Sequence, residues 1–564
     1  MQDPSDTTPV NVDVLVMGAG AAGMTAALIA ALEGLDVLLC EKSPQVGGTT
    51  ASSMGTIWVP GNRRARELGF TDDVDNARRY LDALIGPAGD GRREVFLQSA
   101  PRVVDYLARN SEVKFSAYAK HPDYLINLPG ATLGGRPLAP LPFDGRLLGG
   151  DFELIRPPVG EHLVAGGMMV GRDDIAPLTR PFASADNLLK TASLLWRHAT
   201  DRLRYSRGTR LLMGNALVGR LFYSLRQNKV PIRLNASLRE LTVAAGRISG
   251  AMVDAEGKAM RVNVRRGVVL TTGGFGGSVE RLNDHVRPPL AHAVAFEGAA
   301  GDGARIARAI GAAFEDDHDQ PAFWSPVSDT RWFRGGRGAF AHIALDRAKP
   351  GLIAVNAAGR RFVDEAMSYH EFVKGMLRSH ATVPTVPAWL VCDRAFIKTY
   401  GLGRIPPGRL SLRRFIANGY LVEADTIETL AGKIGVDAAG LHDTVARHNR
   451  FAQTGEDADF GKGSTEFDRN NGDPGHAPNP CLGRIDTAPY HAMAVYPSTL
   501  GTSVGLKTDA DGRVLDTGGE PIAGLFACGA DMASIMRGNY PGPGINLGPA
   551  LVFAYRVAMA LAKP

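Results

Sequence analysis

Short apolar runs alternate with small-residue turns and alanine-rich stretches in the first part of the chain. Residues 12–17 form an apolar run, and residues 24–32 carry alanine and leucine at helical spacing. A second apolar run covers residues 37–40. Later strand-like runs lie at residues 232–243, 248–253 and 262–270, the first two joined by a turn around Ala245, Gly246 and Arg247. This order predicts an α/β domain in which strands and helices alternate around one sheet.

The rest of the pattern indicates that this domain is split by an insertion. The other predicted elements are a helix at 76–110, a Pro- and Gly-rich loop at 137–160, a helix at 304–312, a hairpin at 505–515, a strand from Ile522 and a helix at 550–562. Residues 315–480 mix short helices with loops, and strand-like sequence returns from Arg484. We therefore expect residues 1–310 and 484–564 to form one domain, and 311–483 to form an inserted α+β substrate domain.

A further insertion at residues 140–230 contains a basic amphipathic stretch at about 187–210. Its apolar positions follow helical spacing: Leu188, Ala192, Leu195, Ala199 and Leu203, widened by Leu194 and Trp196. Its charged positions are Lys190, Arg197, Arg202, Arg204, Arg207 and Arg210, against Asp201 alone. Such a helix either lies on an anionic membrane surface or packs on the rest of the protein, and the sequence leaves both readings open.

Composition excludes several classes of protein. With 45% hydrophobic and 21% charged residues among 564, the chain is neither disordered nor a coiled coil, and a net charge of +5 does not imply nucleic-acid binding. Four scattered cysteines, Cys40, Cys392, Cys481 and Cys528, predict no disulfide framework and no metal site. No signal-peptide pattern or membrane-spanning run occurs, so a cytoplasmic protein is expected, with contact at the inner membrane face as the alternative.

The glycine content, 67 residues, points to a ligand approached by backbone. Gly18, Gly20 and Gly23 stand between a predicted strand and a predicted helix, and Glu41 ends the next strand 18 residues later. This context is that of a dinucleotide fingerprint, in which the helix N-terminus binds pyrophosphate and the acidic residue accepts from ribose.

The small-residue stretch at 47–55 has no role in a nicotinamide dehydrogenase, whereas flavoproteins with two dinucleotide-binding folds carry such a segment against FAD. A second glycine turn follows the strand ending at Leu270, and Asp302 opens a helix suited to phosphate or ribityl oxygens, or simply caps it. The residues expected to bind FAD are Gly18, Gly20, Ala21, Ala22, Gly23, Glu41, Lys42, Gly47, Gly48, Thr49, Thr50, Ser53, Met54, Gly55, Leu238, Thr272, Gly273, Gly274, Asp302, Gly529, Asp531, Asn546 and Leu547.

Three separated motifs resemble the FAD-dependent 3-ketosteroid Δ1-dehydrogenase family, within the fumarate reductase and succinate dehydrogenase flavoprotein superfamily. They are Tyr540-Pro-Gly-Pro-Gly544 followed by Leu547-Gly-Pro-Ala550; Pro122-Asp-Tyr124 with Gly135-Arg136; and Gly359-Arg360-Arg-Phe362 with Glu365 before Tyr369. The resemblance covers nearly the whole chain. It implies a Rossmann-like FAD domain, split in sequence, with an inserted substrate domain, and a role in steroid degradation.

The resemblance also implies a mechanism for making a 1,4-diene from a 3-keto-4-ene. Tyr369 matches the tyrosine that takes the C2 proton, and Tyr124 matches its hydrogen-bonded neighbour. Tyr540 and the backbone N–H of Gly544 match the pair that binds the C3 carbonyl, while flavin N5 accepts the C1 hydride. A tyrosine has a pKa near ~10, so Tyr369 needs a neighbour that stabilises its phenolate. An external acceptor, a quinone or a dye, would then reoxidise the flavin.

Departures from the family pattern leave alternatives open. Asn546 stands where threonine is typical, and Asp531 where asparagine is typical. A 3-ketosteroid Δ4-(5α)-dehydrogenase shares fold and ketone; fumarate chemistry would require His-Gly-x-Asn-Arg where this chain has Arg537-Gly-Asn-Tyr540. A binding or scaffold flavoprotein that catalyses no reaction is the alternative from outside the class of enzymes.

No histidine occurs in the N-terminal cofactor segment, so FAD is expected to be bound without a covalent bond. The steroid side chain, electron acceptor and oligomeric state stay open.

Overall fold

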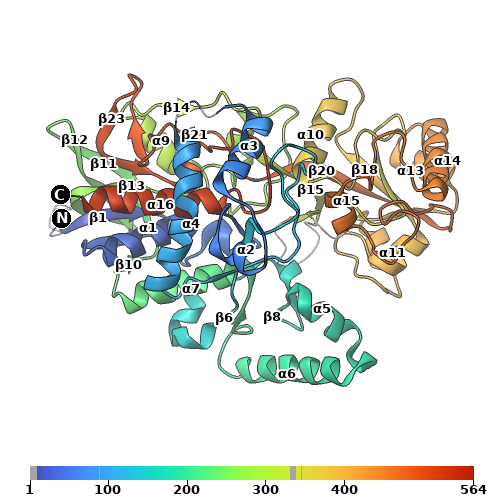
Figure 1. Ribbon diagram of the computed structural model, residues 1–564, viewed down its shortest axis with the longest axis horizontal. Coiled ribbons are helices and arrows are strands. Elements are labelled where there is room, and N and C mark those ends of the chain that lie inside the picture. Colours follow the sequence, from blue (N-terminus) through green and yellow to red (C-terminus); the bar gives the residue numbers. More distant parts are fainter. Residues whose placement is uncertain (1–8, 88, 90, 331–337, 344–345, 564) are drawn as a thin grey trace.

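The computed structural model describes residues 9–87, 89, 91–330, 338–343 and 346–563. These residues form two parts, each built around a β-sheet, and a smaller helical arm that extends from them (Figure 1). The first and last elements of the chain, β1 (Val10–Met17) and α16 (Leu547–Ala562), both lie in the first part, at the left of Figure 1. The mixed α/β architecture confirms the predicted fold class.

Strand β1 (Val10–Met17) lies inside the first, eight-stranded sheet. It pairs in parallel with β2 (Val37–Cys40) on one side and with β13 (Lys258–Leu270) on the other. The remaining strands of this sheet are β10 (Ile232–Arg233), β11 (Ala236–Ala244), β12 (Arg247–Ala255), β22 (Arg513–Leu515) and β23 (Pro521–Ala527). Because β23 pairs in parallel with β13, the C-terminal sequence completes the sheet that the N-terminal sequence begins.

Four helices pack together beside this sheet. They are α1 (Ala21–Leu32), α4 (Arg92–Asn110), α7 (Met213–Gln227) and α16 (Leu547–Ala562), and α1 contacts both α7 and α16. Helix α1 is apolar on all sides, as expected of a helix enclosed by neighbours. The single helix predicted at 76–110 is two helices, α3 (Val74–Ile85) and α4. Gly86, with φ +90°, ends α3, because that backbone conformation cannot continue a helix.

The second sheet has six strands. They are β15 (Ala322–Asp329), β16 (Ala339–Ala341), β17 (Leu352–Val355), β18 (Ala388–Asp393), β19 (Val422–Ala424) and β20 (Tyr490–Thr502). Strand β20 runs antiparallel to β15 and β18. The return to the first sheet expected at Arg484 therefore comes later, at β22. An apolar strand pattern shows that β20 is buried but does not say in which sheet.

The other helices of the second part are α10 (Tyr369–His380), α11 (Arg394–Tyr400), α12 (Arg413–Ala417), α13 (Ile427–Ile434), α14 (Ala438–Thr454) and α15 (Glu466–Asn471). The shorter elements are η1 (Gly48–Ser52), β3 (Ile57–Trp58), α2 (Arg63–Glu67), β4 (Phe115–Ala117), β5 (Pro137–Pro140), β6 (Phe143–Asp144), η2 (Gly145–Leu154), η3 (Gly160–His162), β7 (Leu163–Val164), β8 (Met168–Met169), β9 (Arg210–Leu211), α8 (Val279–Asn283), α9 (Asp302–Arg308), β14 (Phe314–Glu315), β21 (Gly505–Leu506) and η5 (Gly529–Asp531).

The arm consists of α5 (Arg172–Thr179), η4 (Pro181–Ala183) and α6 (Ala185–Asp201), at the bottom of Figure 1. The helix predicted at 187–210 ends at Asp201, so Arg204, Arg207 and Arg210 do not belong to it. The chain turns back here because the Asp201 carboxylate accepts hydrogen bonds, each of 2.8 Å, from the amide and hydroxyl of Thr209.

Helix α6 presents its apolar face outward. Leu189 and Trp196 are 69% and 74% exposed, whereas His198 and Asp201 are buried against the protein. Three of the six basic residues predicted for this stretch are paired with carboxylates: Arg197 lies 2.6 Å from Asp144, and Asp174 lies 2.8 Å from Arg210 and 3.5 Å from Lys190. The apolar face of α6 is therefore not packed on the rest of the protein, which was one of the two alternatives that the sequence left open.

Candidate active site

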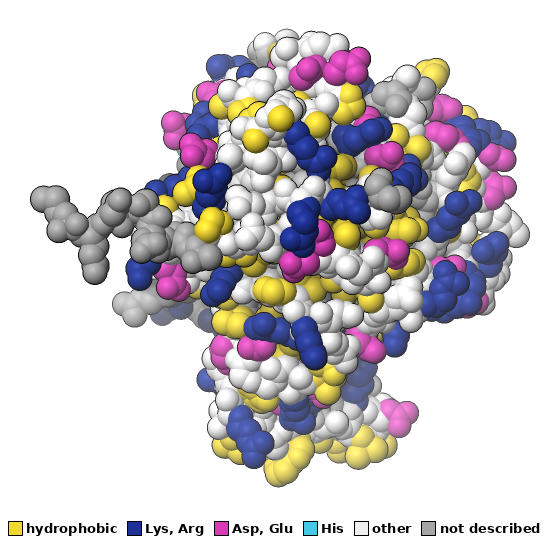
Figure 2. Space-filling view, turned by 90° about the vertical axis from the view of Figure 1, so that its left-hand side faces the viewer, with side chains coloured by type: hydrophobic (Ala, Val, Ile, Leu, Met, Phe, Trp, Pro, Cys, Tyr) yellow, Lys and Arg dark blue, Asp and Glu magenta, His cyan; other side chains and the backbone are white. Residues whose placement is uncertain are grey.

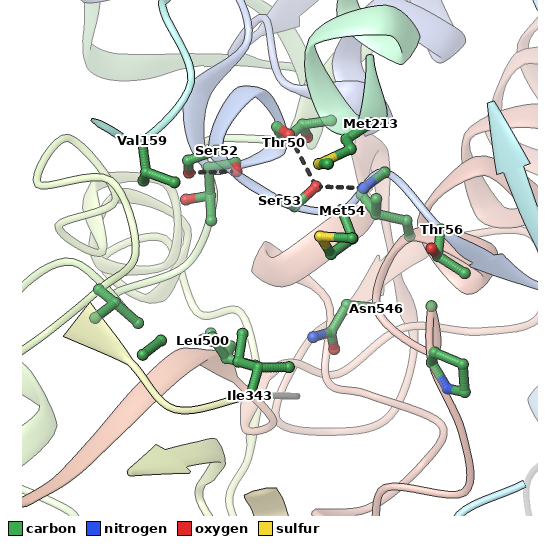
Figure 3. A pocket seen from close by; sticks show the side chains of 18 of the residues that line it. Thr50, Ser52, Ser53, Met54, Thr56, Val159, Met213, Ile343, Leu500 and Asn546 are labelled. Carbon is green, nitrogen blue, oxygen red and sulfur yellow. Dashed lines mark hydrogen bonds between the residues drawn. The ribbon is translucent and has the colours of Figure 1, made fainter. Parts of the chain in front are cut away.

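A cavity of about 1960 Å³ lies between the two sheet-bearing parts and is lined by residues of both. Single-ligand pockets are usually about 300–1,000 Å³, so this one suits a dinucleotide together with a second molecule. Figure 3 shows part of its lining, with Thr50, Ser53 and Met54 on one side and Ile343 and Leu500 on the other.

The N-terminus of α1 opens onto this cavity through Gly20, Ala21 and Ala22. The Ala21 amide donates to the Thr50 hydroxyl (3.1 Å), while the amides of Ala22 and Gly23 have no acceptor within the described part of the chain. Gly20 has no side chain to fill the space in front of them. A helix N-terminus with unpaired amides is suited to phosphate, so the residues fit a dinucleotide.

Glu41 lies at the end of β2 and lines the cavity. Its carboxylate accepts hydrogen bonds from the amides of Ala19 (2.8 Å) and Ser43 (2.9 Å), which fix its position. Lys42 and Asp302, both predicted cofactor residues, form an ion pair of 2.6 Å across the same wall. Asp302 is the first residue of α9 (Asp302–Arg308) and does not cap it, because the N-cap position is Gly301.

Most of the predicted FAD residues line the cavity, and four do not: Gly23, Gly47, Gly274 and Asp531. Gly23 instead allows α1 to pack closely against the preceding turn, because a Cβ there would lie 1.8 Å from the Gly18 carbonyl oxygen. Gly47 and Gly274 have φ values of +119° and +63° and shape the turns beside the cavity.

Asp531 is completely buried behind the cavity wall. It accepts hydrogen bonds from the amide and the hydroxyl of Thr272 (the latter 2.9 Å) and from the Gly274 amide (3.1 Å). Burial, with a contribution from Asp302, raises the pKa of its carboxyl. Asp531 thus holds the Thr272–Gly274 turn in position and has no direct place against a ligand.

Three buried tyrosines meet at another part of the cavity wall. The hydroxyl of Tyr124 donates to that of Tyr369 over 3.0 Å. The Tyr540 ring lies 5.5 Å from that of Tyr124, stacked, and 5.2 Å from that of Tyr369, edge-on. The structure thus brings together the three side chains that the sequence predicted, from a loop before β5, from the start of α10 and from a loop before α16.

The tyrosine hydroxyls are held in the protonated form at neutral pH. Burial raises the pKa of Tyr369 well above its usual value, and Tyr124 and Tyr540 add to the effect. Burial likewise raises the pKa of Tyr540 to about 12. The neighbouring cation is Arg347, which lowers the pKa of Tyr124 against the larger effect of burial.

The motif residues around the tyrosines hold them in place. Tyr124 donates its amide to the Pro541 carbonyl (2.9 Å), and Arg136 binds the carboxylate of Asp123 (2.7 Å). Gly544 has φ +94°, and a Cβ there would lie 2.6 Å from Ile57 backbone atoms. Its amide has no acceptor in the described ranges, so it can donate to a ligand oxygen.

Several lining residues carry no sequence signal. Phe323 of β15 contacts Tyr540 with ring centroids 5.5 Å apart, and Phe467 of α15 contacts Tyr124 at 5.0 Å. Both come from the second part, where no motif marks them, because apolar core positions and apolar cavity walls have the same pattern.

Arg537, the residue considered for fumarate chemistry, does not line the cavity. It pairs with Glu315 (3.0 Å) and Asp317 (2.8 Å). Glu315 also pairs with Arg92 (2.7 Å) and hydrogen-bonds His318 (3.0 Å), so its charge is balanced by the arginines Arg92 and Arg537. The Glu315, Asp317 and His318 cluster is therefore a structural ion-pair network.

Comparison of the sequence with known protein families supports a dinucleotide site in this cavity. The model of a family described as "FAD binding domain" matches residues 13–547. The chain is therefore an FAD-dependent flavoprotein oxidoreductase.

Its relatives define the family more closely. The chain is 35% identical to 3-oxosteroid 1-dehydrogenase of Mycobacterium tuberculosis, over 98% of each chain. It is 38% identical to 4-oxocyclohex-2-ene-1-carboxylate 5-dehydrogenase of Sinomonas cyclohexanicum, over 98% of this chain and 94% of that one. A crystal structure of 3-ketosteroid Δ1-dehydrogenase from Sterolibacterium denitrificans, with 1,4-androstadiene-3,17-dione, matches with a TM-score of 0.90 and 36% identity, over 98% and 99% of the two chains. The chain belongs to the 3-ketosteroid Δ1-dehydrogenase family.

Proposed function

We propose that the protein catalyses 1,2-dehydrogenation of 3-ketosteroids, from the 3-keto-4-ene to the 1,4-diene. The observation that carries this proposal is the Tyr124–Tyr369 hydroxyl pair, with Tyr540 and the Gly544 amide, on a cavity that also takes the cofactor. The relatives named for 3-oxosteroids support the substrate class.

The residues divide the reaction between them. Tyr540 and the Gly544 amide donate to the C3 oxygen, which acidifies the C2–H by stabilising enolate character. Tyr369 removes the C2 proton, and Tyr124 donates a hydrogen bond to the oxygen that receives it. FAD, when bound, supplies the acceptor for the C1 hydride at N5. Phe323 and Phe467 exclude water from the reacting end of the cavity.

We further propose that FAD is bound without a covalent bond. The α1 N-terminus, Glu41 and the 47–55 segment would hold it, and none of these contains a histidine. Cys40 lines the cavity, but burial raises the pKa of its thiol to about 12, so it is an unreactive thiol. Acid precipitation should leave yellow cofactor in the supernatant; flavin in the pellet would contradict this.

A steroid activity assay tests the main proposal. We expect dye-coupled turnover of 4-androstene-3,17-dione with formation of the 1,4-diene. A 5α-reduced ketosteroid oxidised at C4–C5 instead would favour the Δ4 reaction, and absence of any turnover would favour a non-catalytic flavoprotein. The physiological acceptor would be a quinone or similar compound that reaches the same cavity after product leaves.

A ring keto acid is a second candidate substrate. The 38% identical relative is named for 4-oxocyclohex-2-ene-1-carboxylate, which presents a ketone and an adjacent C–C bond for oxidation in the same way. Adding this compound to the same assay decides between the two, because a preference for it over the steroid would reassign the substrate.

We propose that the arm contacts the inner face of a membrane, in a protein that is otherwise cytoplasmic. The exposed apolar side chains of the arm are Ile175 (48%), Phe182 (87%), Leu188 (46%), Leu189 (69%), Leu195 (45%) and Trp196 (74%), and Leu203 (83%) follows just after α6. Figure 2 has hydrophobic side chains gathered at the bottom of the molecule, over this arm. In the described ranges no helix is both long and apolar enough to cross a bilayer, so the contact would be peripheral.

The arm borders the cavity through Arg172, Ile175 and Lys190, so a membrane-dissolved steroid could enter there. Flotation with anionic liposomes tests the contact. Wild type should float, and Leu195→Glu/Trp196→Glu should remain at the bottom. Leu410→Glu is the matched control, because Leu410 is a fully exposed leucine on the second part. Wild type at the bottom of the gradient would exclude the membrane contact.

A further inference from the structure

The loop that carries Tyr540 makes a left-handed turn just before the tyrosine. Arg537 has φ +47° and Gly538 has φ +83°. Glycine adopts such values freely, whereas an arginine does so only at a cost in free energy, because its Cβ approaches backbone atoms. The surroundings of Arg537 must therefore hold it in this conformation.

Carboxylates of the segment between β14 and β15 hold the Arg537 side chain. The guanidinium lies 3.0 Å from the Glu315 carboxylate and 2.8 Å from that of Asp317, and it donates to the Asp317 carbonyl (2.9 Å). In turn, Arg537 lowers the pKa of the Asp317 carboxyl. Glu315 is buried, and its ion pair with the buried Arg92 (2.7 Å) fixes its position. The Arg537 side chain is thus attached to a fixed carboxylate inside the protein.

The same segment also contacts the backbone of the turn. The Arg537 carbonyl accepts a hydrogen bond of 3.0 Å from the Asp319 amide. At Gly538, a Cβ would lie 2.2 Å from the backbone nitrogen of Gln320 and 2.4 Å from its carbonyl oxygen. Because backbone packs directly on backbone here, the turn cannot shift relative to residues 315–320 without losing these contacts.

Residues 315–320 are also connected to the helix that carries Tyr369. The Asp319 carboxylate accepts a hydrogen bond of 3.0 Å from Lys374 of α10. Tyr369 is the first residue of this helix. One short segment therefore contacts both the loop that ends in Tyr540 and the helix that begins with Tyr369.

His370, which follows Tyr369 in α10, gives a second connection. Its Nδ1 accepts a hydrogen bond from the Trp324 amide of β15 (3.1 Å), and its ring lies 5.6 Å from the Tyr540 ring. The Trp324 indole donates to the Gln320 side chain over 2.9 Å. The Tyr540 ring thus packs against α10, while ion pairs and hydrogen bonds hold the turn before it.

We infer that Arg537 is a positioning residue for the reaction: its two ion pairs hold the Tyr540 hydroxyl where it can donate to the C3 oxygen of the substrate. This inference rests on the proposed function and adds to it a residue outside the cavity wall. Arg537 does not line the cavity, so it acts through Tyr540. Because the Tyr540 hydrogen bond strengthens as negative charge develops on the C3 oxygen, its misplacement should affect the transition state more than substrate binding.

The test measures steady-state turnover of 4-androstene-3,17-dione by the FAD-containing protein. Arg537→Gln should lower kcat by about tenfold or more, while KM should change by less than about twofold. Arg537→Lys keeps the charge but loses the fork of donors, so it should recover part of the loss. Asp317→Asn removes one of the two carboxylate partners and should lower kcat by about two- to threefold.

A second substitution at Tyr540 separates positioning from a general structural role. Since Arg537 acts through the Tyr540 hydroxyl, Arg537→Gln should cause no further loss of kcat in protein that already carries Tyr540→Phe. The matched control is Arg513→Gln, which should keep the wild-type kcat. Arg513 is likewise paired with a carboxylate, Asp509 (2.6 Å), but does not line the cavity. FAD content reports whether each variant is folded.

The outcomes separate this inference from the proposed function. An unchanged kcat in Arg537→Gln, or the same fold-loss with and without Tyr540→Phe, would overturn the positioning role while steroid turnover by wild type stands. If Arg537→Gln does not retain FAD, Asp317→Asn decides instead, because Asp317 is exposed, and an unchanged kcat there would overturn the role. Failure of wild type to dehydrogenate the steroid would overturn the proposed function, and this inference with it.

Discussion

The hydroxyls of Tyr124 and Tyr369 lie 3.0 Å apart, although 245 positions separate the two residues in the chain. Tyr124 is attached to the first part and Tyr369 begins α10 on the second. Their hydrogen bond therefore joins the two parts at the site where we propose that a proton is removed from the substrate.

With Tyr369 as the proposed base, its pKa should make the reaction depend on pH. Since burial raises this pKa well above 10, only a small fraction of Tyr369 is phenolate at neutral pH. Steady-state kcat/KM should rise with pH from about 6 to 9, by up to tenfold per pH unit.

Tyr369→Phe should reduce turnover by about 100-fold or more without changing FAD content. Tyr490→Phe, away from the cavity, is the control; full activity in Tyr369→Phe would exclude Tyr369 as the base.

Arg347 should assist the tyrosines through its charge. It is buried, donates to the carbonyls of Glu365 (2.9 Å) and Met367 (3.2 Å), and lowers the pKa of Tyr124. Arg347→Met should reduce kcat by about tenfold and move the pH profile to higher pH. Arg347→Lys, which keeps the charge, should restore the profile in part. If the pH profile of Arg347→Met is the same as that of wild type, the role of Arg347 is purely structural.

Gly544 should tolerate no side chain. With φ +94° and a Cβ position 2.6 Å from Ile57, Gly544→Ala should lower stability by at least about 2 kcal/mol and remove activity. Gly432→Ala is the matched control, because Gly432 lies on the exposed side of α13 with open space around it and alanine favours helix. Thermal unfolding should show a lower Tm for the first variant and an equal or higher Tm for the second.

Acid should weaken the second part through Glu365. Although burial raises its pKa, Arg361 and Lys462 lower it more, to about 2, from 4.5. A carboxyl whose pKa is depressed on folding stabilises the protein above its unfolded pKa, and this contribution, roughly 3 kcal/mol, is lost as pH falls from about 4.5 to 2. The urea midpoint should therefore decrease in this window. Glu365→Gln should be less stable at pH 7, and its midpoint should decrease less; parallel curves would contradict the assignment.

The cofactor half of the site was predictable because its signals are local. Gly18, Gly20 and Glu41 lie within one strand–helix–strand unit, so their spacing already defines where they meet in space. Asp531, predicted from the same kind of pattern, does not line the cavity. It follows a glycine turn, but its side chain points back to Thr272 and Gly274, which sequence spacing alone does not indicate.

The substrate half was predictable only through family motifs. Nothing in the periodicity of residues 311–483 distinguishes Phe467 from other core positions. In the arm, too, the sequence pattern was not sufficient. Helical spacing identified the apolar stripe around Leu195, but it did not show that this stripe faces outward. Hydrophobic patterns say which residues share a face, and long-range packing decides what that face meets.

Tyr124 and Tyr540 both stand on the first part, where the Tyr124 amide donates to the Pro541 carbonyl, whereas Tyr369 stands on the second. A slight rotation between the parts would therefore move the Tyr369 hydroxyl away from the other two tyrosines while leaving every strand and helix intact. Catalytic rate would then collapse with no change in circular dichroism. The rate of turnover is thus more sensitive to the relative position of the two parts than a measurement of secondary structure is.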